Sequence, residues 1–462
     1  MSRWVSLVVL AACGGSTARP VTPTATPGAV TDPDGPHRSA VAAQIQPLVD
    51  AELANGVVIG LYDAGKREIY GFGKGPDGKP PTGTTLFELG SLTHIYTGLL
   101  YADAVQRKEV EMDTQVAELL PPGVTVPTAD RTAITLKHLA LHSSGLPAVP
   151  LTIARRLGSP DPFAGYGEDQ LYRDLISTSL EAAPGTRISR SDYGVGLLAF
   201  ALGKKLNAGG FAGALEKHVI APLGLESTFF TVPEAAASRR ATGTNDDLAP
   251  VAPWTYGALA GAGGLVSSAS DQLALIDAEL DAAAGSKQAI RAAMRLTQEA
   301  QLDSTGANEG LGWNIDSAGR YWQVGTTGGF RSFIGFDPKT RRGVVILASS
   351  SISLIDSIAK RMYGLLDDET VKAPVFPSAA RLAKFEGTYQ FDKFKLAMKA
   401  KGKRMYVEGP GEPPMRMLPV SDHEFWIEQL QTVAVFDQFA DKSPNVIFII
   451  GEHQVTAPRV AD

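Results

Sequence analysis

Phe87-Glu88-Leu89-Gly90-Ser91-Leu92-Thr93-His94 is the stretch that decides the fold. Apolar residues recur at helical spacing from Ser91 to Val105, so the serine stands at the start of a predicted helix. A helix N-terminus stabilises developing negative charge and helps to aim a backbone N–H at an oxyanion. The residue three positions further along lies on the same helix face, and here it is His94. The stretch therefore predicts a serine at the start of a helix, with a histidine on the same helix face.

Strand patterns lie on both sides of this segment, far apart in the sequence. Gly56–Tyr62 and Arg67–Gly71 flank a four-residue turn, and a second pair follows at Phe330–Phe336 and Val344–Leu347. Between the pairs the spacing is helical, in segments 170–180, 193–206, 211–223 and 270–296, and another helix is predicted over 41–53. Strands at both ends with helices between them predict one α+β domain over residues 38–370, with an antiparallel sheet built from distant segments.

A change in composition marks a second folded unit. Residues 371–377 contain Ala373-Pro374-Val375-Phe376-Pro377, which is typical of a linker. Residues 378–462 hold short alternating runs and turns, which predict a small all-β domain, either a barrel or a sandwich.

The overall composition excludes several classes of protein. The 462 residues are 44% hydrophobic and 20% charged, as in soluble globular proteins. A net charge of -6 means that the chain has no excess of positive charge to bind nucleic-acid phosphates, so no nucleic-acid partner is expected. The single cysteine excludes structural disulfides and Cys-ligated metal sites. His138 and His142 are spaced for a metal but lack a third ligand, so no metal and no cofactor is predicted.

The N-terminus carries an export pattern. Arg3 precedes an apolar run, residues 4–12, that is too short to cross a bilayer as a helix. The run ends in Leu10-Ala11-Ala12-Cys13, which resembles a bacterial lipobox; an ordinary signal peptide with an incidental cysteine is the alternative. The resemblance implies a signal peptide over 1–12, lipid on Cys13, and anchoring to the lipid bilayer. Residues 13–37, rich in Thr, Pro, Ala and Gly, predict a disordered tether.

Further motifs occur in a fixed order along the larger domain. They are His142-Ser143-Ser144-Gly145-Leu146-Pro147, Pro184-Gly185-Thr186, Gly263-Gly264-Leu265-Val266-Ser267-Ser268-Ala269-Ser270-Asp271 and Gly328-Gly329-Phe330-Arg331-Ser332-Phe333-Ile334-Gly335-Phe336-Asp337-Pro338. With the Ser91 segment, this series resembles the serine β-lactamases, DD-peptidases and related esterases, and it is most similar to the class C β-lactamase and esterase branch. The resemblance implies a β-lactamase/transpeptidase-like domain, and the C-terminal segment resembles an accessory domain appended to such proteins.

The residues that carry the family's chemistry are mostly replaced. The family has Ser-x-x-Lys where this chain has Ser91 and His94. A neutral imidazole can accept a proton near pH 7, so Ser91 with His94 could form a dyad. The alternative is that His94 only fills space.

Two further family motifs are altered in the same way. The register places Arg190-Ser191-Asp192 at the family's Tyr-x-Asn and Gln323-Val324-Gly325 at its Lys/His-Thr-Gly. An arginine cannot relay a proton, but Arg190 could attract an anionic ligand or pair with Asp192. By the same register, the Thr326 N–H joins that of Ser91 as an oxyanion donor.

These replacements favour a ligand-binding or scaffolding pseudoenzyme over an active hydrolase. Removing one member of a coupled catalytic unit abolishes most of its effect, and here three positions differ. The alternative is an active esterase, peptidase or β-lactamase with Ser91 as nucleophile and His94 as base. The expected location is the bacterial cell envelope, facing the periplasm or the exterior, with a small-molecule, peptide or ester ligand in the cleft.

Overall fold

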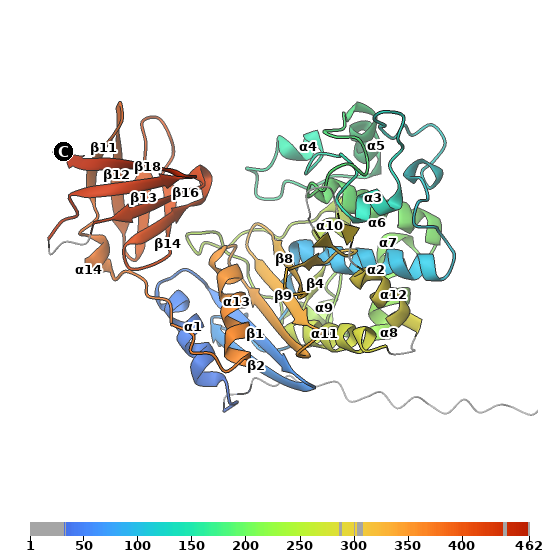
Figure 1. Ribbon diagram of the computed structural model, residues 1–462, viewed down its shortest axis with the longest axis horizontal. Coiled ribbons are helices and arrows are strands. Elements are labelled where there is room, and N and C mark those ends of the chain that lie inside the picture. The colour runs from blue at the N-terminus through green and yellow to red at the C-terminus, as the bar shows by residue number, and fades with distance from the viewer. Residues whose placement is uncertain are drawn as a thin grey trace, which may run out of the picture.

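The computed structural model describes residues 32–460 apart from 33, 286–288, 300, 303–307 and 438–440. The predicted signal peptide (1–12), Cys13 and most of the predicted tether (13–37) lie outside the described residues. A larger α+β domain is followed by a β-barrel at the C-terminal end of the chain (Figure 1). This confirms the predicted fold class.

The helices of the larger domain lie mostly between its first and its last strands. They are α1 (Arg38–Asp50), α2 (Thr93–Gln106), α3 (Leu136–Ala140), α4 (Leu151–Ala154), α5 (Glu168–Ser177), α6 (Asp192–Leu206), α7 (Gly210–Leu215), α8 (Ala221–Leu223), α9 (Glu234–Ala237), α10 (Ala260–Gly263), α11 (Ala269–Ala283), α12 (Ala289–Gln298) and α13 (Leu354–Leu366). The segment 270–296, predicted as one helical stretch, is two helices. The residues between them include Gly285 at φ +90°, a conformation that glycine tolerates and that ends α11.

The main sheet is antiparallel throughout and combines segments from both ends of the domain. Its order is β2-β1-β10-β9-β8-β7-β6-β5. The strands are β1 (Gly56–Asp63), β2 (Lys66–Gly73), β5 (Gln301–Leu302), β6 (Asn308–Glu309), β7 (Asn314–Ile315), β8 (Tyr321–Thr326), β9 (Arg331–Asp337) and β10 (Arg342–Ala348). A separate short pair joins β3 (Phe87–Glu88) to β4 (Val266–Ser267). The early and late strand pairs meet at the β1–β10 contact, so the sheet is built from distant segments, as the sequence predicts.

Both faces of this sheet are covered, which explains its continuous apolar strands. Side chains alternate along β1, where Val58 and Tyr62 enter one core and Val57, Ile59 and Leu61 the other. Helices α1 and α13 cover the second face, whereas α11 packs against β1, β9 and β10 from the opposite side (Figure 1).

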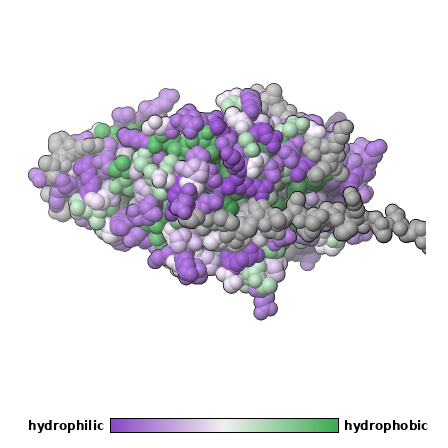
Figure 2. All heavy atoms as spheres, turned by 90° about the horizontal axis from the view of Figure 1, so that it is seen from below, coloured by the Kyte–Doolittle hydropathy of each residue, from purple (hydrophilic) through white to green (hydrophobic). Residues whose placement is uncertain are grey.

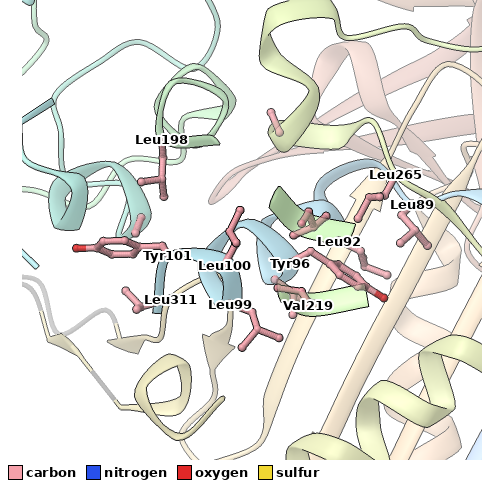
Figure 3. Close-up of a cluster of buried hydrophobic side chains, with 14 of the residues drawn as sticks. Leu89, Leu92, Tyr96, Leu99, Leu100, Tyr101, Leu198, Val219, Leu265 and Leu311 are labelled. Carbon is pink, nitrogen blue, oxygen red and sulfur yellow. The ribbon is translucent and has the colours of Figure 1, made fainter. Parts of the chain in front are cut away.

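The larger of the two cores surrounds α2. Every residue from Thr93 to Ala102 is buried, so this helix has almost no solvent-facing side near its start. Leu92, Tyr96 and Leu99 lie among side chains from other segments, including Leu198 of α6 and Leu265 (Figure 3). A helix buried on all sides is held rigidly by packing, which fixes the position of the turn that precedes it.

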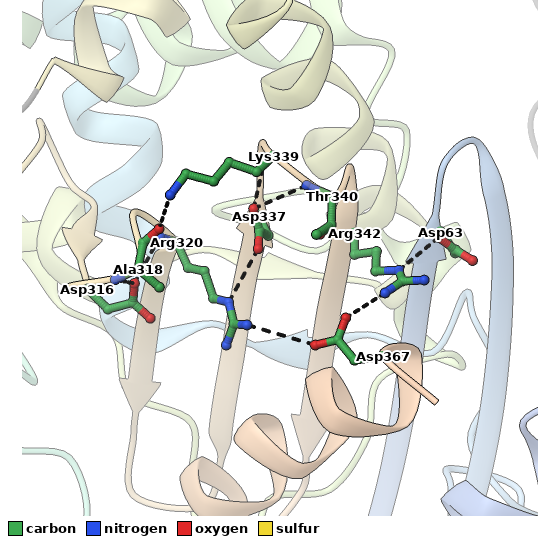
Figure 4. Close-up of polar contacts among 9 residues, drawn as sticks. All are labelled: Asp63, Asp316, Ala318, Arg320, Asp337, Lys339, Thr340, Arg342 and Asp367. Carbon is green, nitrogen blue, oxygen red and sulfur yellow. Dashed lines mark hydrogen bonds and ion pairs between the residues drawn. The ribbon is translucent and has the colours of Figure 1, made fainter. Parts of the chain in front are cut away.

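Ion pairs join the ends of several strands to α13. Arg342 Nε lies 3.1 Å from Asp63 Oδ1, and its Nη1 lies 2.5 Å from Asp367 Oδ1 (Figure 4). Arg320 Nε lies 3.4 Å from Asp337 Oδ2, and its Nη2 also approaches Asp367. The network connects the ends of β1, β8, β9 and β10, away from the candidate site at the other end of β8.

The C-terminal unit is a closed barrel of eight antiparallel strands. They are β11 (Gly387–Phe391), β12 (Phe394–Lys401), β13 (Arg404–Glu408), β14 (Met415–Pro419), β15 (Glu424–Ile427), β16 (Thr432–Phe436), β17 (Asn445–Ile450) and β18 (His453–Val460), and α14 (Ala379–Leu382) precedes them. Closure pairs β11 with β18, so the barrel leaves no free sheet edge.

The barrel contacts the larger domain through polar and apolar groups. Arg404 pairs with Glu52 at 3.7 Å and with Asp247 at 3.3 Å. Leu418 and Trp426 of the barrel pack against the core beneath α1 and α13.

The face turned toward the viewer in Figure 2 is mostly hydrophilic, with hydrophobic residues in small groups. Among the described residues, no helix is both long and apolar enough to cross a membrane.

Candidate active site

Ser91 lies in the turn between β3 and α2. Gly90 adopts φ +53°, and a short 3-10 turn, Gly90–Leu92, leads directly into α2. A Cβ on Gly90 would lie 2.7 Å from the Thr326 backbone nitrogen, so only glycine fits there. Ser91 is half-buried at the N-terminus of a buried helix, which is the position that the sequence predicts for a nucleophile.

Strand β8 lies against this turn. A Cβ on Gly325 would lie 1.9 Å from the Leu89 carbonyl oxygen and 2.9 Å from the Ser91 nitrogen. Ser332 of β9 donates a hydrogen bond to the same Leu89 oxygen at 2.7 Å, which holds the two segments together. The structure therefore places the backbone of Thr326 beside that of Ser91, although a role for the two N–H groups in binding an oxyanion stays a prediction.

His94 lies one helical turn further on and faces Asp192. Its side chain is 1% exposed, and its Nε2 lies 3.3 Å from Asp192 Oδ1. Among the described residues, neither ring nitrogen makes a hydrogen bond to Ser91. Burial lowers the pKa of His94, Asp192 opposes this shift, and the charge of Arg190 adds to it. The imidazole is therefore neutral at pH 7 and makes no hydrogen bond to the serine hydroxyl.

Asp192 is the first residue of α6 and is ionised. Burial opposes its ionisation, but attraction from His94, Arg190 and His142 holds the pKa of its carboxyl below the ordinary value. A carboxylate in the first turn of a helix also interacts favourably with the helix dipole. Ser191 caps α6 by accepting a hydrogen bond from the Gly194 N–H at 2.9 Å, so the segment that carries Arg190 and Asp192 is fixed.

His142 completes this buried group, and its position was not predicted. Its ring centre lies 5.3 Å from that of His94, and its Nδ1 accepts a hydrogen bond from the Ser191 N–H at 3.0 Å. Burial, with the neighbouring His94 and Arg190, lowers the pKa of His142 to about 3. His142 was singled out from the sequence only as part of a motif and for its spacing from His138.

Arg190 contacts Gln323 rather than Asp192. Its Nη2 donates to Gln323 Oε1 at 2.9 Å, and no ion pair between Arg190 and Asp192 occurs among the described residues. Gln323 is itself fixed, because its Nε2 donates to the Gly312 carbonyl at 3.0 Å and Asn314 donates to its Oε1 at 3.2 Å. The exposed Arg190 thus carries a permanent positive charge that acts on His94, His142 and Asp192 and is held by an uncharged partner.

A cavity of about 480 Å³ lies beside the β3 segment. It is lined by Glu88, Arg240 and Trp254 among others, and Arg240 Nη2 donates to Glu88 Oε1 at 2.9 Å. Burial raises the pKa of Glu88, while Thr327 and Arg240 oppose that shift. The paired carboxylate therefore lines this neighbouring cavity, whose lining does not include Ser91.

The two histidines considered as metal ligands, His138 and His142, make different contacts. His138 Nδ1 accepts a hydrogen bond from the Thr135 N–H at 3.2 Å, which caps α3, whereas His142 faces His94. In the part of the chain that the structure describes, no three His, Cys, Asp or Glu side chains form a group that could hold a metal ion.

Comparison with known proteins identifies the family. Residues 41–365 match the family model described as Beta-lactamase. The chain belongs to the beta-lactamase family. It is 27% identical over 345 residues to a Beta-lactamase of Escherichia coli (strain K12), covering 66% of this chain and 87% of that protein. It is 28% identical over 324 residues to the D-alanyl-D-alanine-carboxypeptidase/endopeptidase AmpH of the same organism, covering 64% and 80%. A Beta-lactamase of Pseudomonas fluorescens is 25% identical over 351 residues, covering 68% and 94%.

Membership of the beta-lactamase family confirms the resemblance drawn from the ordered motifs. The matched region contains Ser91, His94, Arg190, Asp192 and Gln323. These five side chains come from three separate segments, and the structure gathers them around the start of α2. Their assignment to particular catalytic tasks stays a prediction.

Proposed function

We propose that this chain is a lipid-anchored envelope protein that keeps the β-lactamase fold to bind an anionic ligand without turning it over. The observation that carries the proposal is the contact of His94 with Asp192. A general base must reach the proton that it removes, and the imidazole makes no hydrogen bond to Ser91.

The ligand class follows from the charge at the cleft. Arg190 is exposed and permanently charged, and its Nη2 is held by the Gln323 amide rather than neutralised by a carboxylate. A carboxylate-bearing peptide or ester suits this position, because an arginine guanidinium can bind a carboxylate through two parallel hydrogen bonds. A relative is named as a D-alanyl-D-alanine-carboxypeptidase/endopeptidase, which supports a peptide ending in D-alanine as the probe.

Calorimetry with N-acetyl-D-alanyl-D-alanine and its C-terminal amide tests this proposal. The acid should bind about tenfold more tightly than the amide, and Arg190→Gln should abolish that difference. Arg187→Gln is the matched control, because Arg187 is exposed on the same segment but pairs with Glu181. Release of D-alanine by the wild-type protein that disappears in Ser91→Ala would instead establish an active peptidase.

The anchor is tested separately. If the Leu10-Ala11-Ala12-Cys13 stretch is a lipobox, the mature chain begins at Cys13 and partitions with membranes. Cys13→Ala should block processing or release the protein into the aqueous fraction. Processing and membrane attachment that are unchanged in this variant would refute the lipoprotein assignment while leaving the ligand proposal intact.

A further inference from the structure

The C-terminal barrel contains an open, apolar cavity of about 500 Å³. This volume is within the range of cavities that hold small-molecule ligands. An eight-stranded barrel is wide enough either to be filled by its own side chains or to hold one small ligand. The position of the cavity relative to the strands shows whether this barrel is filled by its own side chains or has room for a ligand.

The side-chain alternation places the cavity inside the barrel. Along β17, Val446 and Phe448 are buried in the barrel core, and Ile450, two residues on, continues the same face toward the opening. Along β12, Leu396 is buried in that core and Phe394 precedes it on the same face. Phe448 and Leu396 belong to the barrel core and also line the cavity, so the cavity is part of the barrel interior, at the end where β17 turns into β18, and not a groove on the outside.

The other end of the barrel is closed. Leu382 of α14 and Phe385 belong to the barrel core, and the Phe385 ring stacks on Phe436 at 4.4 Å. Phe436 ends β16, whose first residue, Thr432, lines the cavity. Arg459 Nε donates to the Ser443 carbonyl and Arg459 Nη2 to the Lys384 carbonyl, which fixes the closed end. The interior therefore has a filled end and an open end.

The open end leaves large apolar side chains in contact with water. Phe394, Leu430 and Ile450 are 42–45% exposed, and they are three of the eight exposed large hydrophobic residues on the described part of the chain. Phe391 packs against Phe394 and Phe448, with ring centres 5.3 and 5.1 Å apart, and so forms an aromatic wall. Several exposed apolar side chains around one cavity mark a binding site rather than a random surface feature.

The charges around the opening select the head group of a ligand. Four hairpin connections meet at this end, and they carry the exposed carboxylates Asp392, Glu412, Glu428 and Glu452. The lysines near the same opening are Lys393 and Lys395, so acidic groups outnumber basic ones. Glu412 also lines the cavity itself. A fatty-acid carboxylate would be repelled by this rim, whereas an uncharged or cationic head group would not.

We propose that the barrel binds one single-chain amphiphile, with its alkyl chain in the cavity and an uncharged or cationic head group at the acidic opening. Such a site would be separate from the Ser91 cleft and would give the C-terminal domain a ligand of its own.

Displacement of the fluorescent probe N-phenyl-1-naphthylamine tests the site. The full-length chain carrying Cys13→Ala is used, so that no lipid on the chain itself competes. Monolaurin, below its micelle concentration, should displace the probe at about tenfold lower concentration than laurate. Absence of probe binding to this protein, or equal displacement by laurate, would overturn the proposal.

Variants locate the binding within the barrel. A Cβ on Gly409 would meet only Leu396 Cδ2, at 3.6 Å, so Gly409→Phe should fill the cavity without displacing backbone and weaken monolaurin binding about tenfold. Ile450→Asp should have the same effect and serves if the first variant does not fold. Val420→Asp is the control, because Val420 is 45% exposed beyond the other end of β14. Wild-type affinity in a folded Gly409→Phe or Ile450→Asp, or equal loss in Val420→Asp, would place binding elsewhere.

Discussion

A lysine at position 94 would reach toward Ser91 on a flexible stem, whereas the His94 ring is short, buried and directed at Asp192. Burial lowers the pKa of the imidazole and keeps it neutral at pH 7, and a neutral imidazole can accept a proton. The ring makes no hydrogen bond to Ser91, and we propose that alignment is what the site lacks.

The buried His142 should make the protein unstable in mild acid. Its pKa is about 3 in the folded protein, against about 6.5 for an unperturbed histidine. The unfolded chain therefore takes up a proton below pH 6.5 that the folded chain does not, and this proton uptake stabilises the unfolded state. Between about pH 7.5 and about pH 5, His142 should lower the free energy of unfolding by about 2 kcal/mol.

Urea unfolding at the two pH values measures this contribution. His142→Asn can still accept the Ser191 N–H and tolerates the positive φ of this position, so it should fold and lose about 2 kcal/mol of the pH dependence. His453→Asn, at an exposed histidine of the barrel, is the control. An undiminished pH dependence in His142→Asn would show that other groups cause the acid sensitivity.

Restoring the family's side chains should restore chemistry only in combination. His94→Lys alone should add little, because the Arg190 and Gln323 positions still lack a proton relay and a family-type anchor. His94→Lys with Arg190→Tyr and Gln323→His should give measurable acylation of Ser91 by a fluorescent penicillin, visible on a denaturing gel. Acylation by the single variant equal to that of the triple variant would show that lysine was the one missing group.

The sequence predicted which residues meet at the site better than it predicted their contacts. Ser91, His94, Arg190, Asp192 and Gln323 were placed together by motif order, and the structure brings them together. The suggested Arg190–Asp192 pair is absent because Asp192 faces His94. The contact of His94 with His142 depends on packing between segments far apart in sequence, which spacing within one helix cannot show.

The turn that presents Ser91 depends on the close approach of two elements, β8 and the start of α2. Gly90→Ala would combine strain at φ +53° with contact to the Thr326 backbone at 2.7 Å, so it should destabilise the protein by about 2–4 kcal/mol. Gly78→Ala separates the two causes, because Gly78 has φ +79° with nothing within 4 Å of a built Cβ. Gly78→Ala should lower the free energy of unfolding by only about 1–2 kcal/mol.

Thermal unfolding of the two glycine variants measures the difference. Equal melting temperatures for Gly90→Ala and Gly78→Ala would show that the β8 contact imposes no constraint of its own.

Strand alternation predicted the paired strands β1–β2 and β9–β10, but the closure of the barrel could not be predicted, because it depends on pairing of β11 with β18 across some 70 residues.

The two folded units should be separable, since they have distinct cores. Deleting residues 378–462 removes no residue of the candidate site, but it uncovers the apolar surface beneath Leu418 and Trp426. The remaining domain should fold with a melting temperature lower by a few degrees, about 2–4 °C for each kcal/mol lost. Circular dichroism that shows global unfolding would mean that the larger domain requires the barrel.

We propose that the chain keeps the β-lactamase fold but that Ser91 has no aligned base. Intact-protein mass spectrometry after incubation with benzylpenicillin, in wild type and in Ser91→Ala, tests this proposal. We expect no added mass in either protein and no loss of the β-lactam from solution. An adduct on the wild-type protein that is absent from Ser91→Ala, or Ser91-dependent loss of benzylpenicillin, would contradict it.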